Sequence, residues 1–531
     1  MGIYIDKGNA AFQRVRNSEY IDKSGLIAVV NNTLFTEQSF TCVTRCRRFG
    51  KSIAAKMLAA YYDRSCDSRH LFADLAIASD PTFEQHLNKY PVIYLDLSSF
   101  AGEMSRKGIV EEIEKRLVKD IRTAFPKTPV PRGGSLMDYL LRIHGETGDV
   151  FIFIIDEWDA ILRENAEMSN SRQQRSNLKD DYINWLRRMF KSVSGTEVFA
   201  GVYMTGILPI KKYNTQSALN NFQEYSMITP RKMAPYFGFT KEEVKGLAAK
   251  HGMDFDELEK WYDGYQIGVQ PSMFNPNSVM QAIDNGRCES FWASTGAFDS
   301  ISDYIERNFD GLKDDILYVL AGGRVKVNTT KFRNDLWDVR SRDDVLTVLI
   351  HLGYLSFDWQ ERECYLPNYE VSEELANAVE ESSWTVVAQA LRQSERLLMA
   401  TLRSDAETVA RLVEAAHDSE ASILKYNDEN TLSCVISIAY YYAHGDYIFH
   451  RELPTGRGYA DLVLMPRKNV DKPAIVIELK NNEKPSCAIA QIKERHYTDK
   501  VAEYTGDILL VGISYDEQTK EHKCQIETWH K

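Results

Sequence analysis

One stretch of the chain combines residue types that could bind phosphate. In 43-VTRCRRFGKSI-53, the residues Gly50, Lys51 and Ser52 lie between an apolar, strand-like run and a helical pattern. In that context, backbone N–H groups and the start of a helix cradle phosphates. The Lys51 ammonium group would reach the β- and γ-phosphates of a nucleotide, and the Ser52 hydroxyl would ligate Mg²⁺. The stretch therefore predicts a nucleotide site.

The same stretch departs from the general phosphate-loop pattern, G-x-x-x-x-G-K-[ST]. Arg45 stands where the first glycine is expected, and Arg47 and Arg48 make the loop strongly basic. These cations could contact phosphates, or they could dock another subunit or a nucleic acid. An ordinary solvated basic loop would have the same composition, so the residues alone leave all these alternatives open.

A second stretch supplies the acidic residues that such a site needs. In 151-FIFIIDEWDAIL-162, a strongly apolar run ends in Asp156 and Glu157. Asp156 could hold Mg²⁺ while Glu157 orients or deprotonates the attacking water, although a solvated acidic loop after a buried strand looks the same. Thr205 ends a further apolar run, where its hydroxyl could sense a γ-phosphate. The order of these motifs along the chain favours a working ATP site.

A separate group of residues has the spacing of a metal-dependent phosphodiesterase. In 474-AIVIELK-480, Glu478 and Lys480 lie two apart on an expected strand, so both project from one face. Asp461 begins another apolar run, and paired strands could bring it to Glu478 as ligands for Mg²⁺ or Mn²⁺, with the Leu479 carbonyl in reach. Lys480 would position or activate the attacking water. A surface ion pair has the same E-x-K spacing, but the apolar run indicates a strand buried on both faces.

The elements that must position these residues follow two patterns. Over about the first 230 residues, apolar runs alternate with helical patterns, which is typical of a parallel βαβ sheet. The expected strands are 38–44, 91–97, 150–155 and 198–205, and the expected helix after the loop is 52–63.

The rest of the chain divides into a middle segment and a C-terminal unit. The middle segment has a capping box at Thr240, a helical pattern over 344–352 and a hairpin pattern over 353–368. The C-terminal unit is expected to hold strands 447–452, 459–465, 474–480 and 508–513 with helices 431–443 and 487–497. The sequence therefore predicts an α/β protein with a P-loop parallel-sheet domain at 1–233, a helical, winged-helix-like segment at 234–415 and a nuclease-like α/β domain at 416–531.

The composition narrows the class of protein. A chain of 531 residues with 44% hydrophobic and 26% charged residues is too long for one core and is typical of soluble globular proteins. The net charge of −12 requires that any nucleic acid be held by local basic patches or metal ions. Eight scattered cysteines, no signal-peptide pattern and no apolar run near membrane-spanning length favour the cytoplasm and no membrane association.

Several motifs, taken in order, resemble the bacterial AAA-ATPase-like family, whose members commonly carry a C-terminal PD-(D/E)XK nuclease-like domain. The motifs are YIDKSGLI, RCRRFGKS, IIDEWDAI, MTGILPI, WYDGYQIG, FNPNSV and GYLSF…LPN. An R-R-F-G-K-S core is a trait of that family, so the resemblance implies that Arg45 is not a sign of decay. It also implies that nucleotide and Mg²⁺ are bound by Lys51, Ser52, Asp156 and Glu157. The full predicted nucleotide-binding set is Arg48, Phe49, Gly50, Lys51, Ser52, Ile53, Asp156 and Thr205.

The resemblance extends to the C-terminal helices. The family has an N-E pair ahead of the helix expected at 431–443; this chain has 427-NDEN-430 there, which makes Glu429 a candidate further metal ligand. Gln491, Lys493, Arg495 and Tyr497 match the Q-I…Y pattern of the family and would contact phosphate or surround the metal.

These observations predict an ATP-binding and ATP-hydrolysing enzyme coupled to a Mg²⁺- or Mn²⁺-dependent nuclease that acts on DNA, with RNA as a possible substrate. A homo-oligomer is expected because P-loop ATPases often complete their sites across subunits, and Arg231 is a candidate to act in trans. One alternative is a nucleotide-dependent switch whose C-terminal domain binds nucleic acid without cleaving it. Another is a scaffold in which both sites are vestigial.

Overall fold

The computed structural model groups the described residues into two compact units. The first is Met1–Cys288 with Asn328–Arg362, and the second is Glu289–Val327 with Glu363–Lys531. The three-part division predicted from the sequence stays a prediction. The described residues are 2–101, 108–163, 172–191, 193–210, 212–213, 216–217, 219–270, 272–292, 309–332, 339–381, 385–420, 436–455, 458–467, 470–494, 506–516 and 518–530.

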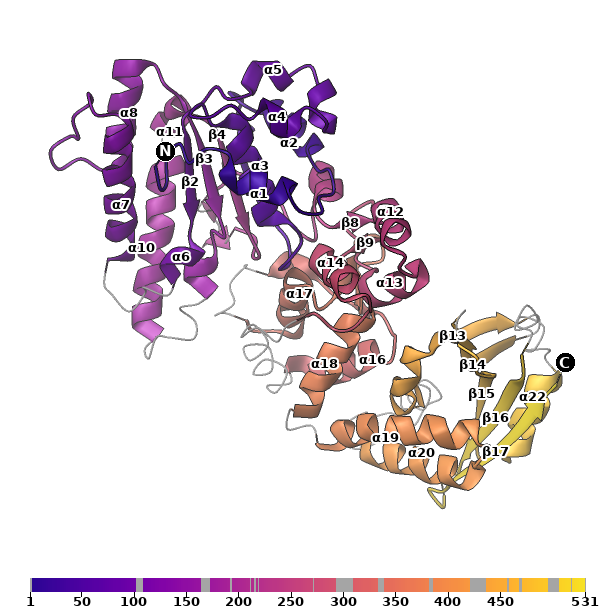
Figure 1. Cartoon of the computed structure of the whole chain (residues 1–531). Coiled ribbons are helices and arrows are strands. Elements are labelled where there is room, and N and C mark those ends of the chain that lie inside the picture. The colour runs from indigo at the N-terminus through magenta and orange to yellow at the C-terminus, as the bar shows by residue number, and fades with distance from the viewer. Residues whose placement is uncertain are drawn as a thin grey trace. The chain divides into compact units, whose positions relative to one another are not determined.

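A parallel five-stranded sheet forms the centre of the first unit (Figure 1). The strands lie in the order β2-β3-β4-β1-β7, and every neighbouring pair is parallel. Four of them lie where apolar runs predicted strands, whereas β7 is short and polar and was not predicted. Because β4 lies between β1 and β3, the carboxyl ends of these three strands meet at one edge. The strands are β1 (Phe40–Thr44), β2 (Val92–Asp96), β3 (Phe151–Asp156), β4 (Phe199–Gly206) and β7 (Gln223–Tyr225).

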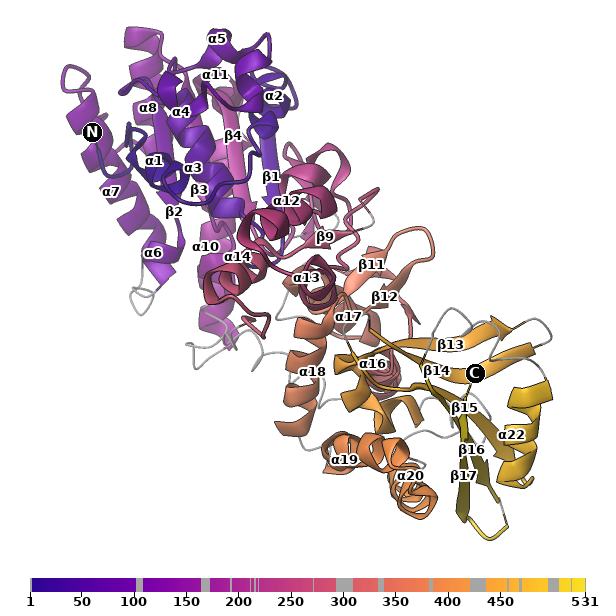
Figure 2. The same cartoon turned by 45° about the vertical axis from the view of Figure 1, so that its right-hand side comes forward.

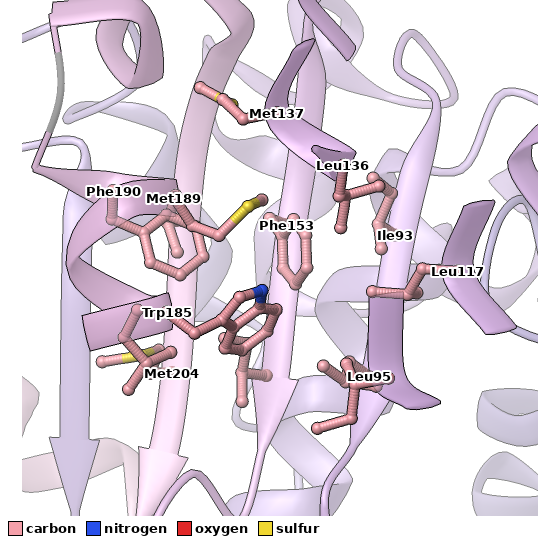
Figure 3. Close-up of a cluster of buried hydrophobic side chains, with 14 of the residues drawn as sticks. Ile93, Leu95, Leu117, Leu136, Met137, Phe153, Trp185, Met189, Phe190 and Met204 are labelled. Atoms are coloured by element: carbon pink, nitrogen blue, oxygen red, sulfur yellow. The ribbon is translucent and has the colours of Figure 1, made fainter. Parts of the chain in front are cut away.

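Both faces of this sheet are buried, as its continuous apolar runs predict. Phe153 and Ile155 of β3 point to one face, where they join a core with α7 (Ile109–Ala124), α8 (Leu136–Thr147) and α10 (Arg172–Phe190). Figure 3 shows this core, with Trp185 of α10 packed beside Phe153. Alternate β3 residues point to the other face, which is covered by α1 (Ala10–Arg16), α2 (Gly25–Asn31) and α3 (Lys51–Tyr62).

Short helices and strands complete the first unit. The predicted capping box is present, since the Thr240 hydroxyl accepts the Glu243 N–H and the Glu243 carboxylate accepts the Thr240 N–H. The helices are α4 (Arg69–Phe72), α5 (Phe83–His86), α6 (Ser98–Ala101), α11 (Val193–Val198), α12 (Lys241–His251), α13 (Phe255–Tyr262), α14 (Pro276–Asn285), α17 (Arg342–Leu352), η1 (Ala76–Ser79), η2 (Arg231–Tyr236) and η4 (Thr329–Lys331). The strands are β5 (Lys212–Tyr213), β6 (Gln216–Ser217), β8 (Phe239–Thr240), β9 (Met273–Phe274) and β11 (Ser356–Asp358).

A mixed five-stranded sheet forms the centre of the second unit, in the order β13-β14-β15-β16-β17. Only β15 and β16 are parallel, and α22 (Pro485–Glu494) connects them and packs against both (Figure 2). The polar β17 was not predicted. The strands are β13 (Tyr447–Thr455), β14 (Gly458–Pro466), β15 (Ala474–Asn481), β16 (Ile508–Tyr515) and β17 (His522–Trp529).

The remaining elements of the second unit are mainly helical. Ser404, at φ +57°, lies between a helix that ends at Leu402 and one that begins at Ala406. The elements are α16 (Leu312–Leu320), α18 (Tyr369–Glu381), α19 (Thr385–Leu402), α20 (Ala406–Glu420), η3 (Phe309–Gly311), η5 (Tyr441–Gly445), β10 (Val325–Lys326) and β12 (Glu363–Tyr365). Among the described residues of the whole chain, no helix has both the length and the apolar character needed to cross a membrane.

Candidate nucleotide and nuclease sites

The basic loop lies between β1 and α3, as the sequence predicts. Gly50 has φ +85°, and no atom lies within 4 Å of where a Cβ would be, so conformation rather than space favours glycine here. Phe49 is buried edge-on against the Tyr265 ring, with 5.1 Å between ring centroids. Lys51 begins α3, and its Nζ donates to the carbonyls of Arg45 (2.9 Å) and Cys46 (2.8 Å). Burial lowers the pKa of Lys51.

The other predicted residues of this loop differ in exposure. Ser52 is partly buried at the second position of α3, so it lies beside Lys51 at the start of the helix. Arg48 is exposed and has φ +69°, and Ile53 is 43% exposed. Arg48 and Ile53 therefore lie on the accessible side of the loop.

Arg45 is not part of a solvated basic surface, because its side chain is fully buried. Its Nη1 donates to the carbonyls of Thr44 (2.8 Å) and Tyr225 (2.9 Å), and its Cζ lies 5.3 Å from the centre of the Phe237 ring. Burial lowers the pKa of Arg45 to about 10. The solvated-loop alternative is therefore wrong for this residue.

Asp156 ends β3 and is held by two hydroxyl groups. Its carboxylate is 3% exposed and accepts from Thr205 Oγ1 at 2.5 Å and from Tyr94 Oη at 3.0 Å. The Glu157 N–H donates to the same Thr205 oxygen at 3.2 Å. Burial, with the Asp156 charge beside it, raises the pKa of Tyr94, so this hydroxyl stays a donor. Thr205 thus joins both predicted acidic residues to the end of β4.

Glu157 has an unusual backbone and a cationic partner. Its φ is +53°, a conformation that residues other than glycine seldom adopt and that is often found at functional sites. Arg163 Nη2 donates to its carboxylate at 2.8 Å, and Arg163 Nε donates to Asp159 at 3.1 Å. The fully buried Asp159 also accepts the N–H groups of Ile207 and Leu208, the latter at 2.9 Å. Arg163 therefore links Glu157 to Asp159, whose carboxylate is fixed by the main chain just after β4.

Glu478 lies near the end of β15 and is 2% exposed. Its Oε1 accepts from the Gln491 amide of α22, and Lys480 Nζ lies 3.8 Å from the same oxygen. Glu478 pairs with Gly512 of β16, where a Cβ would lie 2.4 Å from the Pro485 carbonyl oxygen. Glycine at this position therefore lets α22 approach the sheet closely enough for Gln491 to reach Glu478.

The other predicted residues of the second site have separate placements. Leu479 is 2% exposed and pairs with Ile513, while Lys493 forms an ion pair with Glu527. Asp461 belongs to β14, but its side chain lies outside the described part of the structure. Glu429, Arg495 and Tyr497 lie outside the described residues. Within the described part, no group of three or more His, Cys, Asp or Glu side chains could hold a metal ion.

Comparison with known families identifies one domain in each unit. The sequence model of a family described as "Predicted AAA-ATPase" matches residues 7–215, and that of the PD-(D/E)XK nuclease superfamily matches residues 428–525. The chain joins an AAA-ATPase-like domain to a PD-(D/E)XK nuclease-superfamily domain. The resemblance drawn from the motifs is confirmed, and so is the α/β fold with its parallel and mixed sheets.

Individual relatives are more distant. An uncharacterized protein encoded in the vnfD 5′ region of Azotobacter chroococcum mcd 1 is 21% identical over 300 residues, which is 54% of this chain. The chain spans about half of that relative, 53% of its length. Among solved structures, Cdc6p from Pyrobaculum aerophilum is 12% identical with a TM-score of 0.25, covering 70% of this chain and 94% of Cdc6p. The Aeropyrum pernix ORC1 protein, solved in complex with DNA, is 10% identical with a TM-score of 0.23, covering 71% of this chain and 97% of that one.

The residues of the ATPase-like domain fit a nucleotide with Mg²⁺. A lysine and a hydroxyl at the start of α3 suit phosphate oxygens and a hard cation, and Asp156 offers the carboxylate that such a cation prefers. The nuclease-superfamily domain brings a buried carboxylate and a lysine together at the end of β15, which suits a divalent cation beside a phosphodiester.

Sequence reasoning missed three residues that organise the ATPase-like site: Tyr94, Asp159 and Arg163. The spacing of Asp159 and Arg163 is that of an i,i+4 ion pair, so a helix beginning after 156-DEW-158 could have suggested that pair. No local pattern links Tyr94 to Asp156. They meet because β2 and β3 are neighbours, with Asp96 paired to Asp156.

Proposed function

We propose that the protein is an ATPase coupled to a nuclease, in which ATP binding and hydrolysis control a Mg²⁺- or Mn²⁺-dependent enzyme that cleaves DNA. The observation that carries the proposal is the Thr205 hydroxyl, which bonds both the Asp156 carboxylate and the Glu157 N–H. This arrangement supports the proposal because the proposed metal ligand, Asp156, and the proposed water activator, Glu157, lie at the strand edge from which the lysine-bearing loop also starts.

In the nucleotide site, Lys51 would exchange its bonds to loop carbonyls for the β- and γ-phosphates. Ser52 and Asp156 would hold Mg²⁺, which when bound neutralises charge on the phosphate oxygens. Glu157 would orient the attacking water and accept its proton. Thr205 would keep Asp156 and Glu157 in fixed relation, and Arg163 would set the direction of the Glu157 carboxylate. Arg48, Phe49, Gly50 and Ile53 would shape the loop.

In the nuclease site, Glu478 and Asp461 would be the carboxylate ligands, with the Leu479 carbonyl and Glu429 as further candidates. The antiparallel pairing of Leu462 with Ile477 supports this, because the same register extended by one residue sets Asp461 opposite Glu478. A bound Mg²⁺ or Mn²⁺ would stabilise charge on the phosphodiester.

Lys480 would position the water in this site. Gln491 would orient Glu478 through the hydrogen bond that joins them. Lys493, Arg495 and Tyr497 are proposed contacts to phosphate.

The alternative is a nucleotide-dependent switch whose C-terminal domain binds nucleic acid without cleaving it. The ion pair between Arg163 and Glu157 favours slow turnover, because it occupies the carboxylate that would activate water. We further propose that the protein is a cytoplasmic homo-oligomer, with Arg231 as a candidate residue acting in trans.

A cleavage assay tests the proposal. The whole protein is incubated with linear and circular DNA, or with RNA, in Mg²⁺ or Mn²⁺, with and without ATP. We expect metal-dependent DNA cleavage that changes with ATP and is abolished in Asp461→Ala and Lys480→Ala. Lys472→Ala is the matched control, since Lys472 pairs with Asp446 at 2.5 Å in the same unit.

The outcomes separate the two functions. The proposed nuclease activity is contradicted if cleavage persists in Lys480→Ala. It is also contradicted if none of the DNA or RNA substrates is cleaved. DNA binding without cleavage, with ATP affinity intact and lost in Lys51→Ala, supports the switch. Light scattering of the purified protein with and without ATP tests the proposed oligomer.

A further inference from the structure

Arg45 occupies the position of a glycine in the general phosphate loop, yet its side chain does not point toward the accessible side of the loop. It is fully buried beneath the loop, in contact with Phe237. A long cation at this position is costly to bury, so its contacts should explain its presence.

The contacts of Arg45 join three strands of the parallel sheet. Its N–H donates to the Gly206 carbonyl at the end of β4 at 3.1 Å. Its guanidinium Nη1 donates to Thr44 of β1 at 2.8 Å and to Tyr225 of β7 at 2.9 Å. The guanidinium therefore fixes the end of β1 against β7, and the main-chain N–H fixes it against β4, just where the loop begins.

The carbonyl of the same residue holds Lys51. Lys51 Nζ lies 2.9 Å from the Arg45 oxygen and 2.8 Å from the Cys46 oxygen. A displacement of the Arg45 main chain would thus move both the start of the loop and the acceptors that set the Lys51 ammonium group.

The charge of Arg45 is not neutralised by an acid. In the part of the chain that the structure describes, no carboxylate lies within ion-pair distance of this guanidinium, and its Nε and Nη2 have no hydrogen-bond partner. The Tyr203 hydroxyl and His351 Nδ1 also have no hydrogen-bond partner among the described residues. A buried cation that bonds only to main-chain oxygens fixes backbone geometry, and its charge favours an anion on the loop above it.

We propose that Arg45 is a positioning residue for the nucleotide polyphosphate: it acts through the main chain of the loop to place Lys51. This inference rests on the proposed function, because it presumes that ATP is the ligand of the loop. It explains why the chain has arginine where the general pattern has glycine: the side chain braces the loop from beneath.

A double-mutant cycle tests the inference. The affinity for a fluorescent ATP analogue is measured for wild type, Arg45→Met, Lys51→Met and the double variant, after circular dichroism confirms the fold of each. We expect Arg45→Met to weaken binding about tenfold, and we expect it to add less than about threefold when Lys51 is already methionine, since residues that act through one another are not additive. Arg45→Lys, which keeps the charge, should restore part of the affinity.

Two further measurements separate positioning from general stability. Arg64→Met is the matched control, because it removes an arginine that pairs with Asp149 at 2.6 Å in the same unit, and it should leave ATP affinity unchanged. Amide exchange at residues 50–52 without nucleotide should be faster in Arg45→Met and unchanged in Arg64→Met.

The inference is overturned if Arg45→Met binds ATP as wild type does, or if its effect is the same with and without Lys51. If Arg45→Met does not fold, Arg45→Gln replaces it in the cycle with the same criteria. A wild-type protein that binds no ATP overturns the proposed function and this inference together. If Lys51→Met loses binding while Arg45→Met binds ATP as wild type does, only the role of Arg45 is overturned.

Discussion

The two candidate sites both lie at the ends of buried strands, but they are held together in different ways. In the ATPase-like domain, the contacts come from neighbouring strands of the parallel sheet and from the loop. Lys51 bonds to two loop carbonyls, and Asp156 is fixed by hydroxyls from β2 and β4. In the nuclease-superfamily domain, Glu478 is contacted by Gln491 of α22, a helix packed on the sheet, and by Lys480 of its own strand.

This difference indicates how each site should respond to mutation. The acidic residues of the nucleotide site lie at the end of the buried strand β3, beside β4, so a substitution of Glu157 should remove chemistry while the site keeps its shape. The site around Glu478 depends on how closely α22 packs on the sheet. Substitutions that move α22 should therefore disturb the contact between Gln491 and Glu478.

The largest expected effect is a loss of ATP hydrolysis in the nucleotide site, with ATP affinity kept. Glu157→Gln keeps the size of the side chain and removes its ability to accept a proton. We expect the rate of ATP hydrolysis to fall on the order of 10²- to 10⁴-fold, with ATP affinity within about threefold of wild type. Phosphate release and equilibrium binding measure the two quantities, and a variant that keeps half of the hydrolysis rate would show that Glu157 is not the base.

The next effect tests the dependence of the second site on packing. Gly512→Ala would place a Cβ 3.1 Å from the Ala488 Cβ and closer still to the Pro485 oxygen, so α22 must move. We expect a loss of about 1–3 kcal/mol in the free energy of unfolding of this unit and faster amide exchange in α22. Gly246→Ala is the control, since nothing lies within 4 Å of the added Cβ on helix α12. Equal stability of the two variants in urea denaturation would refute the packing argument.

A third effect concerns the hydroxyl that joins the two acidic residues of the first site. Thr205→Val keeps the shape and leaves Asp156 Oδ1 and the Glu157 N–H without this partner. We expect a cost of about 1–3 kcal/mol in the stability of the first unit. Thr347→Val, which removes only a bond within a helix to the Asp343 carbonyl, should cost less. Thermal denaturation of the two variants measures the difference, and an equal cost would contradict a special role for Thr205.

The smallest expected effect is a pH-dependent change in stability caused by Asp6. This residue lies beside the start of β2, at an edge of the parallel sheet that has no proposed chemistry. Burial and the nearby Asp63 charge raise the pKa of Asp6 to about 6, against an opposing hydrogen bond from the Val92 N–H and the charge of Arg64. A raised pKa means that the folded state binds the proton more tightly, so this contribution to stability is present below about pH 4 and is lost as the pH rises through 6.

Asp6→Asn removes that titration and tolerates the local φ of +50°. It should therefore be more stable than wild type above pH 6, by about 1–2 kcal/mol because solvent screens part of the interaction, and equally stable near pH 4. Denaturation curves at several pH values check this. A difference that is constant with pH would assign the effect to something other than Asp6 ionisation.

The sequence was most informative where a largely apolar run of residues ends in, or is followed by, a charged residue. The runs that end at Thr44, Asp156 and Lys480 predicted both the strand and the residues beyond it, because burial on both faces leaves a strong pattern. The strands β7 and β17 could not be predicted, because their residues are polar and their positions are set by pairing with β1 and β16.

The direction of a side chain was harder to predict than its position. Arg45 was expected near phosphate or solvent, whereas its partners come from Tyr225 and Gly206, far along the chain. Such contacts depend on which strands become neighbours. No local pattern around residue 45 records that order, so the buried bracing of the loop could be found only in the structure.

The division of the chain into two units limits where the chain can be cut without removing part of a unit. The chain passes between units after Cys288, Val327 and Arg362, so each unit is assembled from two separate segments. The segment Asn328–Arg362 is bonded into the first unit, where the Tyr265 hydroxyl donates to the Gly353 carbonyl and the Gln266 N–H donates to the Ser356 hydroxyl. A single cut between Cys288 and Asn328 separates this segment from the rest of the first unit. A fragment that ends at residue 288 would therefore lack the Gly353 and Ser356 partners of Tyr265 and Gln266.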